Sequence, residues 1–330
     1  MDKLKQIKRG QFFTRGDSWL KPQVLKYIKS TKSKFCYDPF AGGGDLLKLK
    51  DTYEIDYMRG LDLDPILGWR LNDSLVDIPH IDDAIIITNP PYLSKNSTTR
   101  KGIMNEMTKY FETTEYDDLY MLALDKMLEA QDNIVAILPE TFINSNYKQK
   151  GRLVSITILE ENPFSDTKTP VCVACFDGKI KEFSEIKVYK NEDYLFSLED
   201  LEAKRLKPTR SVNIKFNDLE GWLGLRAIDT TNPEELIKFG EKSDFNYDWD
   251  KHINISSRAL TLINIDIPDN KKKEFINECN TVLKEVREDT KDTILSPFKC
   301  NMKNGKRRRR LDFKTARAII EIAYERNIKK

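Results

Sequence analysis

The sequence predicts an α/β fold with a Rossmann-like, mostly parallel sheet. In its first half, short apolar runs alternate with stretches of helical spacing, which is typical of a sheet covered by helices on both faces. The expected strands are Phe35–Tyr37, Tyr57–Leu61, Ala84–Thr88, Asn133–Leu138, Leu153–Leu159 and Val171–Phe176. No helix separates the last two, so we expect an antiparallel hairpin at one edge of the sheet.

Helices are expected where apolar residues recur every three or four positions. The clearest segment is 116–131, with apolar residues at helical spacing from Leu119 to Ala130. An amphipathic helix is expected at Pro22–Ser30, and Leu46–Leu49 should be helical after a glycine-rich turn. Near the end of the chain, LDFKTARAIIEIAYERN has the same spacing and should dock as a helix.

The chain has 330 residues, which predicts two domains. Beyond about residue 200 the strand–helix alternation fades, so we place a catalytic domain at 1–195 and a second domain at 196–330. The net charge of +2 is unevenly divided. Residues 201–330 hold 28 Lys and Arg against 21 Asp and Glu, a net of +7, which leaves −5 for the rest. This division favours a polyanionic partner for the second domain.

The sequence argues against several classes of protein. No apolar stretch approaches the ~20 residues of a membrane span, and the first residues lack the apolar core of a signal peptide. The five cysteines are scattered and odd in number, which favours reduced thiols in the cytoplasm of a bacterial or phage-infected cell. Cys172 and Cys175 have CxxC spacing but lie in a strand-like run, so we expect core packing and no metal site.

Three polar motifs follow predicted strands. They are DPFAGGG from Asp38 to Gly44, Asp62 in LDLDP, and NPPY from Asn89 to Tyr92. The carboxyl ends of parallel strands form the ligand-binding edge of an open α/β sheet. Glycines permit a tight turn and a close approach of backbone to ligand. A carboxylate such as Asp62, with Asp64 as a rival, can accept hydrogen bonds from ribose hydroxyls.

The NPPY motif suits the polarisation of an amino group. Two consecutive prolines give a rigid backbone without N–H donors. The Asn89 side-chain oxygen and the Pro90 carbonyl oxygen can then accept hydrogen bonds from one amino group, which makes its nitrogen lone pair more available. Tyr92 offers a flat face on which a base can stack.

Together, DPFAGGG, LDLDP and NPPY make residues 9–177 resemble the amino-group DNA methyltransferases that use S-adenosyl-L-methionine. QFFT at 11–14, Asp73 in NDSL, and NPFSDTKTPVCVACF at 162–176 fit further motifs of that family. Between QFFT and Pro22 the chain departs from the family pattern, because RGDSW intervenes. The motif order, with an extra domain at the C-terminal side, resembles the gamma group of N6-adenine enzymes.

The resemblance implies roles for individual residues. The residues that would bind the cofactor are Phe13, Thr14, Asp38, Pro39, Phe40, Ala41, Gly42, Gly44, Asp62, Leu63, Asp73 and Asn89. The catalytic residues would be Asn89, Pro90, Pro91, Tyr92 and Phe164. Tyr92 and Phe164 would sandwich the flipped base.

The function implied is site-specific methylation of adenine N6 in double-stranded DNA. The C-terminal domain would read the sequence, no metal would be needed, and a cognate restriction endonuclease could act separately. The chain would be a monomer or weak dimer. Three alternatives remain: protein-glutamine N5 methylation, RNA adenine N6 methylation, and a DNA-binding protein without activity.

Two basic segments are candidates for DNA contact. The polar segment Leu93–Thr113 could close over the flipped base or touch phosphates, or be a plain surface loop; its candidates are Lys95, Arg100 and Lys101. The second segment is the run Lys306, Arg307, Arg308, Arg309 and Arg310. Adjacent cations repel each other, so we expect this run to have no folding role and to contact phosphates or guanine edges.

Overall fold

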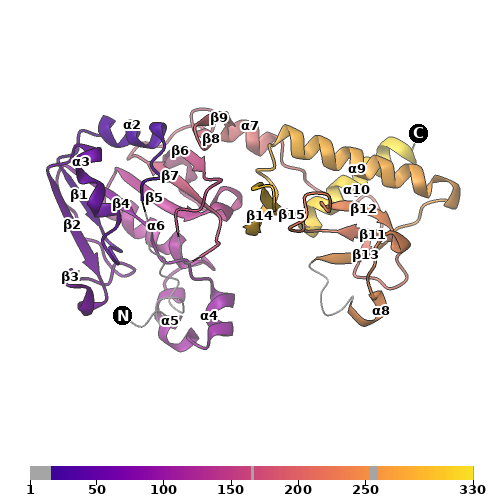
Figure 1. Cartoon of the computed structure of the whole chain (residues 1–330), viewed down its shortest axis with the longest axis horizontal. Helices are drawn as coiled ribbons and strands as arrows, with labels where there is room; N and C mark the ends of the chain where they lie inside the picture. Colours follow the sequence, from indigo (N-terminus) through magenta and orange to yellow (C-terminus); the bar gives the residue numbers. More distant parts are fainter. Residues whose placement is uncertain (1–15, 165–166, 253–258, 330) are drawn as a thin grey trace. The chain divides into compact units, whose positions relative to one another are not determined.

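The computed structural model describes residues 16–164, 167–252 and 259–329 (Figure 1). The chain divides into two compact units, one up to Glu199 and one from Asp200 onward. The boundary predicted between residues 195 and 196 falls inside strand β9, which spans Asp193–Ser197.

A nine-stranded sheet forms the centre of the first unit, in the order β3-β2-β1-β4-β5-β7-β6-β8-β9. The strands are β1 Phe35–Asp38, β2 Tyr57–Asp62, β3 Arg70–Leu71, β4 Ala84–Thr88, β5 Ile134–Pro139, β6 Leu153–Ile158, β7 Val171–Phe176, β8 Lys187–Lys190 and β9. Strands β1 to β5 pair in parallel, and β7 is antiparallel to both β5 and β6. The Rossmann-like α/β prediction is confirmed.

The β6–β7 hairpin does not lie at the edge of the sheet, so that prediction was wrong. Strand β8 pairs in parallel with β6, and β9 then forms the outer edge. The sequence of these two strands, KVYKNEDYLFS, is largely polar and partly exposed, as expected for the end of a sheet. It therefore lacks the continuous apolar run of a buried strand.

Figure 1 shows the helices and 3₁₀ turns of this part of the chain. The helices are α2 Pro22–Ser30, α3 Lys50–Tyr53, α4 Lys95–Lys101, α5 Met104–Phe111, α6 Leu119–Ala130 and α7 Leu198–Ala203. The 3₁₀ turns are η1 Leu46–Leu49, η2 Pro65–Leu67, η3 Glu140–Asn144 and η4 Lys150–Arg152. The predicted helix at Leu46–Leu49 is thus a 3₁₀ turn that continues into α3.

One layer of the core shows how the sequence pattern builds this fold. Val24 and Ile28, four positions apart on α2, share a buried cluster with Ile85 and Ile87 of β4. Side chains two apart on a strand point to the same face. The apolar stripe of α2 therefore covers one face of the central strands.

The second unit contains a four-stranded antiparallel sheet in the order β10-β13-β11-β12. Its strands are β10 Lys215–Phe216, β11 Leu223–Arg226, β12 Lys238–Glu241 and β13 Leu260–Asn264; a separate hairpin joins β14 Ser296–Asn301 to β15 Arg307–Arg310. The remaining elements are η5 Lys242–Asp244, α8 Trp249–His252, η6 Asp269–Lys271, α9 Lys272–Asp289 and α10 Phe313–Asn327. Helix α10 occupies the segment predicted to dock as a helix.

Among the described residues, no helix is both long and apolar enough to cross a membrane. Cys172 and Cys175 are buried within β7. The described part of the chain holds no group of three or more His, Cys, Asp or Glu side chains that could ligate a metal ion.

Candidate active site

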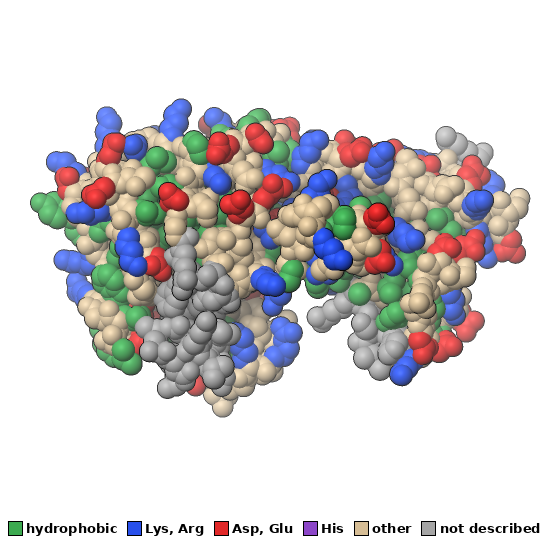
Figure 2. All heavy atoms as spheres, in the orientation of Figure 1, with side chains coloured by type: hydrophobic (Ala, Val, Ile, Leu, Met, Phe, Trp, Pro, Cys, Tyr) green, Lys and Arg blue, Asp and Glu red, His purple; other side chains and the backbone are tan. Residues whose placement is uncertain are grey.

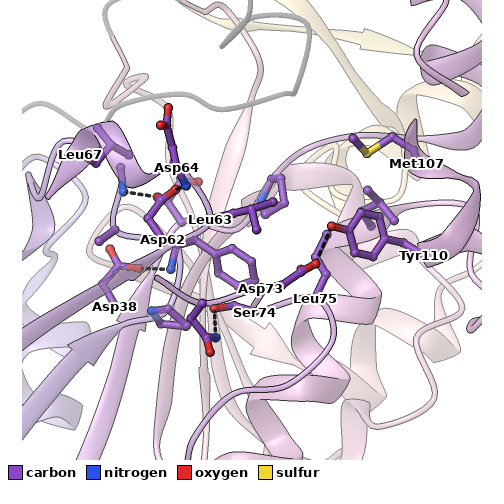
Figure 3. A pocket seen from close by; sticks show the side chains of 18 of the residues that line it. Asp38, Asp62, Leu63, Asp64, Leu67, Asp73, Ser74, Leu75, Met107 and Tyr110 are labelled. Atoms are coloured by element: carbon purple, nitrogen blue, oxygen red, sulfur yellow. Dashed lines mark hydrogen bonds between the residues drawn. The ribbon is translucent and has the colours of Figure 1, made fainter. Parts of the chain in front are cut away.

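A cavity of about 260 Å³ lies at the carboxyl ends of β1, β2 and β4 (Figure 3). Parallel strands bring these ends together, as the sequence predicts. The predicted residues that line the cavity are Asp38, Pro39, Phe40, Ala41, Gly42, Asp62, Leu63, Asp73, Asn89 and Pro91. Phe13 and Thr14 lie outside the described residues.

Asp38 is the last residue of β1 and is almost completely buried. Its Oδ1 accepts hydrogen bonds from the Phe40 backbone N–H, at 2.9 Å, and from the hydroxyl of Thr88. Burial raises the pKa of Asp38 to about 7, against the opposing effect of these two hydrogen bonds. Thr88 directly precedes Asn89, so this bond ties the glycine-rich turn to the NPPY motif.

Asp62 ends β2 and is also buried. Its two carboxylate oxygens accept backbone N–H groups from Gly42 and Asp64, each at 2.9 Å. Gly42 has a φ of 51°, the left-handed region that favours glycine. Asp62 therefore fixes the glycine-rich turn, and each of its oxygens still has a second lone pair for a ligand.

Gly44 packs closely against Trp69. It does not line the cavity; a Cβ added there would come within 2.6 Å of the Trp69 ring. The Trp69 Nε1 group donates a hydrogen bond of 2.8 Å to the Gly42 carbonyl. Gly44 is needed for this packing of Trp69 against the turn, and nothing in the sequence spacing pointed to Trp69.

Asp73 lies across the cavity from the glycine-rich turn. Its Oδ2 accepts a hydrogen bond from the Tyr110 hydroxyl at 2.9 Å (Figure 3). The same oxygen accepts an ion-pair hydrogen bond from Lys109 at 3.0 Å. Both partners belong to α5, which also contributes Glu106 and Met107 to the lining. The helical spacing of Met104, Met107, Tyr110 and Phe111 could have identified this wall within the polar segment Leu93–Thr113. The segment forms the two helices α4 and α5.

The NPPY motif follows β4 and reaches the same cavity through Asn89 and Pro91. Pro90 is buried beside them. The Tyr92 hydroxyl donates a hydrogen bond of 2.8 Å to the Ile137 carbonyl of β5, and burial raises the pKa of Tyr92 well above its usual value. Tyr92 is thus held as a neutral phenol whose oxygen is bound to the sheet.

The predicted sandwich of Tyr92 and Phe164 is absent in this arrangement. Their rings meet edge to face, with centroids 6.1 Å apart and planes at 68°. No base can stack between two parallel faces in this geometry, since the rings contact each other directly. A base could stack here only after the two rings separate.

The predicted DNA-contact residues of the first unit lie on α4. Lys95 and Arg100 are exposed, and Lys101 is half-buried. On the face of the molecule that Figure 2 shows, basic and acidic side chains are interspersed and no single large basic patch forms. The excess of basic residues in the second unit therefore does not produce a large basic patch on this face.

The arginine run has a folding role, contrary to the prediction. It forms β15, in which Arg307 and Arg309 are buried while Arg308 and Arg310 are half-buried. Arg307 donates to the Asn301 side chain, and the Arg309 backbone N–H donates to Asp229. The expectation that the run has no folding role is thus wrong for Arg307 and Arg309, because a strand directs alternate side chains to opposite faces.

Comparison with known proteins gives one family match. Residues 83–167 match the Eco57I restriction-modification methylase family. That segment contains Asn89, Tyr92 and Phe164. The predicted resemblance to methyltransferases of restriction-modification systems is therefore confirmed for this segment, and the match supports S-adenosyl-L-methionine as the cofactor. The gamma group stays a prediction. No curated protein matches the chain in sequence.

Solved structures with a similar fold include three bacterial proteins. One is described as a class I S-adenosylmethionine-dependent methyltransferase from Listeria monocytogenes, with 16% identity, a TM-score of 0.40, and coverage of 60% of this chain and 72% of that one. A type I modification subunit from Vibrio vulnificus has 16% identity, a TM-score of 0.37 and coverage of 57% and 49%. A type I methyltransferase subunit from Streptococcus thermophilus has 14% identity, a TM-score of 0.38 and coverage of 61% and 55%. This chain thus spans about half the length of the two type I subunits.

Proposed function

We propose that this protein is a DNA methyltransferase that transfers a methyl group from S-adenosyl-L-methionine to N6 of a flipped adenine. One observation carries the proposal: Asn89 and Pro91 of NPPY line the same cavity as Asp38, Asp62 and Asp73. An amino group held by Asn89 would then lie beside the bound cofactor. The methylase match over residues 83–167 supports this assignment.

The cavity suits this cofactor in chemistry. Three acidic residues line it, Asp38, Asp62 and Asp73, and the cofactor is positively charged. Apolar side chains, among them Leu63 and Leu119, offer surfaces for an adenine ring. Asp62 is placed to accept from ribose hydroxyls with its remaining lone pairs.

When bound, S-adenosyl-L-methionine supplies a methyl group activated by its positively charged sulfur. The chain supplies position and polarisation. The Asn89 amide oxygen accepts an N–H of the target amino group and so raises the availability of the nitrogen lone pair. Tyr92, its hydroxyl fixed on Ile137, presents a ring to the base. The amino proton is released to water after transfer.

The proposal also specifies duplex DNA as the substrate. The exposed cations Lys95 and Arg100 on α4 follow the NPPY motif directly and suit phosphate contacts. The net charge of +7 over residues 201–330 supports a DNA-reading role for the second unit. A site-specific enzyme of this kind would act in a restriction-modification system, with a separate endonuclease as its partner.

A methyl-transfer assay tests the proposal. The full chain is incubated with tritium-labelled cofactor and offered duplex DNA, RNA or protein, and labelled nucleosides are identified by chromatography. We expect label in duplex DNA as N6-methyladenine. Label confined to RNA or to protein glutamine would instead establish one of the two alternative enzymes. Absence of label from all three would contradict an active methyltransferase.

Asn89→Ala supplies the decisive variant for this assay. It removes an acceptor needed in the transition state, so turnover should fall by about a hundred- to a thousand-fold, the usual cost of losing one positioned polar group. Cofactor affinity, measured by calorimetry, should change far less. The matched control is Asn133→Ala, which alters an asparagine at the opposite end of the sheet, before β5. Normal turnover by a folded Asn89→Ala protein would contradict the role of NPPY.

A further inference from the structure

Helix α5 forms one complete wall of the cavity. Glu106, Met107, Lys109 and Tyr110 all line it. The helix has eight residues and begins soon after Gly102, which ends α4 in the left-handed conformation with a φ of 69°. A helix this short is marginal by itself in water. Its position must therefore depend on contacts with the rest of the unit.

Those contacts are concentrated at the C-terminal end of α5. Tyr110 and Phe111 are its buried residues. The Tyr110 hydroxyl and the Lys109 amine both bind Oδ2 of Asp73, and the amine also lies over the Tyr110 ring, 4.5 Å from its centroid. The three side chains form a compact cluster that fastens α5 to the turn that carries Asp73.

Asp73 is a firm anchor for this cluster. The Val76 backbone N–H donates to the Asp73 carbonyl at 2.9 Å. Beside it, the Asn72 side chain donates to the Ser74 hydroxyl and to the Asp77 carbonyl. The turn that carries Asp73 is therefore braced by its own hydrogen bonds. If the cluster opens, α5 is the part that moves.

Both α5 donors bind the same carboxylate oxygen of Asp73. Among the described residues, none donates to the other oxygen, Oδ1. The carboxylate can thus keep α5 in place and still accept from a ligand in the cavity. Closure of the wall and ligand binding do not compete for one acceptor atom.

We propose that the Asp73–Lys109–Tyr110 cluster is a latch that holds α5 over the bound cofactor and sets the cofactor's residence time. This inference rests on the proposed function, because it takes S-adenosyl-L-methionine and its product as the ligands of the cavity. It adds Lys109 and Tyr110 as positioning residues for the cofactor. Product release then requires the latch to open.

The two hydrogen bonds to Asp73, from Tyr110 and from Lys109, contribute unequally to the latch. Tyr110 is 4% exposed as a whole residue, whereas the Lys109 side chain is 61% exposed. Solvent and salt screen an exposed ion pair strongly, so Lys109 contributes less. Burial raises the pKa of Tyr110, which keeps its hydroxyl protonated as a donor. We therefore place most of the latch in the Tyr110 hydroxyl.

Tyr110→Phe tests the latch, since it keeps the ring and removes only the hydroxyl. The measured quantity is the dissociation rate of S-adenosyl-L-homocysteine from the full chain, followed by stopped-flow displacement. Loss of a hydrogen bond to a charged group should raise this rate by about ten-fold or more. Lys109→Met should raise it by a smaller factor, and the difference from wild type should shrink at high salt.

Tyr147→Phe is the matched control. The Tyr147 hydroxyl also donates to an aspartate carboxylate at 2.9 Å, that of Asp125, and Tyr147 is 3% exposed. Tyr147 does not line the cavity. Its substitution should leave the dissociation rate unchanged while any general loss of stability appears in thermal unfolding of both variants.

Hydrogen exchange of the α5 amides gives a second readout that does not depend on the rate measurement. Bound S-adenosyl-L-homocysteine should slow their exchange in the wild-type chain and slow it less in Tyr110→Phe. Equal dissociation rates and equal protection in the two proteins would overturn the latch and leave the proposed function intact. Failure of the wild-type chain to bind the ligand would overturn the proposed function itself.

Discussion

Two buried aspartates, one in each unit, make similar bonds to the backbone and serve different ends. Asp62 accepts backbone N–H groups from Gly42 and Asp64. Asp229, which is fully buried, accepts backbone N–H groups from Ile237 and Arg309. Each carboxylate therefore fixes a turn of the chain. The two carboxylates differ in whether a Lys or Arg side chain of the protein neutralises their charge.

Asp229 is neutralised by Arg287. The guanidinium binds both oxygens of Asp229 at 3.1 Å and also binds Asp292 at 2.7 Å. No Lys or Arg among the described residues forms an ion pair with Asp62. The negative charge of Asp62 remains available to a ligand in the cavity, whereas that of Asp229 is consumed by the fold. Charge neutralisation thus distinguishes the two sites better than burial does.

The largest expected effect concerns Asp229. Asp229→Ala leaves the Arg287 guanidinium half-paired in a buried site and removes the acceptor of two backbone N–H groups. Breaking a buried pair on one side costs about 3–5 kcal/mol of stability. Thermal unfolding of the full chain should show this loss in the second unit, with cofactor affinity unchanged.

Asp269→Ala is the control for that variant. Asp269 also pairs with a cation, Lys272, but its side chain is 94% exposed. Its removal should leave the unfolding transition almost unchanged. Equal stabilities of the two variants would contradict a structural role for the Asp229 cluster.

Asp62→Ala should lower cofactor affinity more than stability, the reverse of what we expect for Asp229→Ala. It removes the proposed acceptor for the ribose hydroxyls and loosens the glycine-rich turn, so cofactor affinity should fall by about 1–3 kcal/mol. Asp64→Ala is the comparison, because the Asp64 side chain lines the same cavity but is used to cap η2 through the Ile66 backbone N–H. Calorimetry should show a much smaller loss for Asp64→Ala. A larger loss for Asp64→Ala would assign the ribose to that residue.

The edge of the sheet that lines the cavity could be predicted because its signals are local. Asp38, Asp62 and Asn89 each follow an apolar run, and parallel strands bring such positions to one edge of the sheet. The same reasoning placed β1, β2, β4 and β5 within a residue or two of their observed ends. Neither inference required any contact between distant parts of the chain.

The remaining features depend on contacts that sequence spacing does not reveal. The partner of the Arg309 backbone N–H, Asp229, lies 80 residues earlier in the chain. Tyr110 and Asp73 are 37 residues apart, so no local pattern links them. Helix α5 has apolar residues at helical spacing, at Met104, Met107, Tyr110 and Phe111, but this spacing does not show that the helix lines a cavity. A strand period of two applied to the arginine run could have separated its buried members from its outer ones. Its uniform charge concealed that pattern.

Asp38 gives a prediction of intermediate size, based on pH. Its folded-state pKa is raised to about 7, chiefly by burial. Below this pH the carboxyl is neutral, and above it the carboxylate attracts a cationic ligand. Cofactor affinity should therefore rise as the pH increases from 6 to 8, by several-fold. Asp38→Asn, which is close in shape and cannot ionise, should flatten this dependence; an unchanged profile would contradict the role of Asp38.

The smallest expected effect concerns the basic run from Lys306 to Arg310, whose side chains point to two different faces of the strand. Lys306 is exposed, and no described residue pairs with the half-buried Arg310 side chain, so these two are free to reach phosphates. Arg308 is partly engaged, since it donates to the Asp229 carbonyl and stacks on Phe298. Arg307 and Arg309 face inward. DNA contact should therefore come mainly from Lys306 and Arg310.

The double variant Lys306→Ala, Arg310→Ala should weaken duplex binding a few-fold without loss of stability. Its log–log salt slope should flatten by up to about 0.9 for each phosphate that the variant no longer neutralises. Arg307→Ala, Arg309→Ala should instead lower the unfolding temperature. Removing two exposed cations elsewhere in the same unit, Lys284 and Lys291, controls for net charge. If that control flattens the salt slope as much as the first variant, binding follows the overall charge of the unit and the outward face of β15 makes no specific contact.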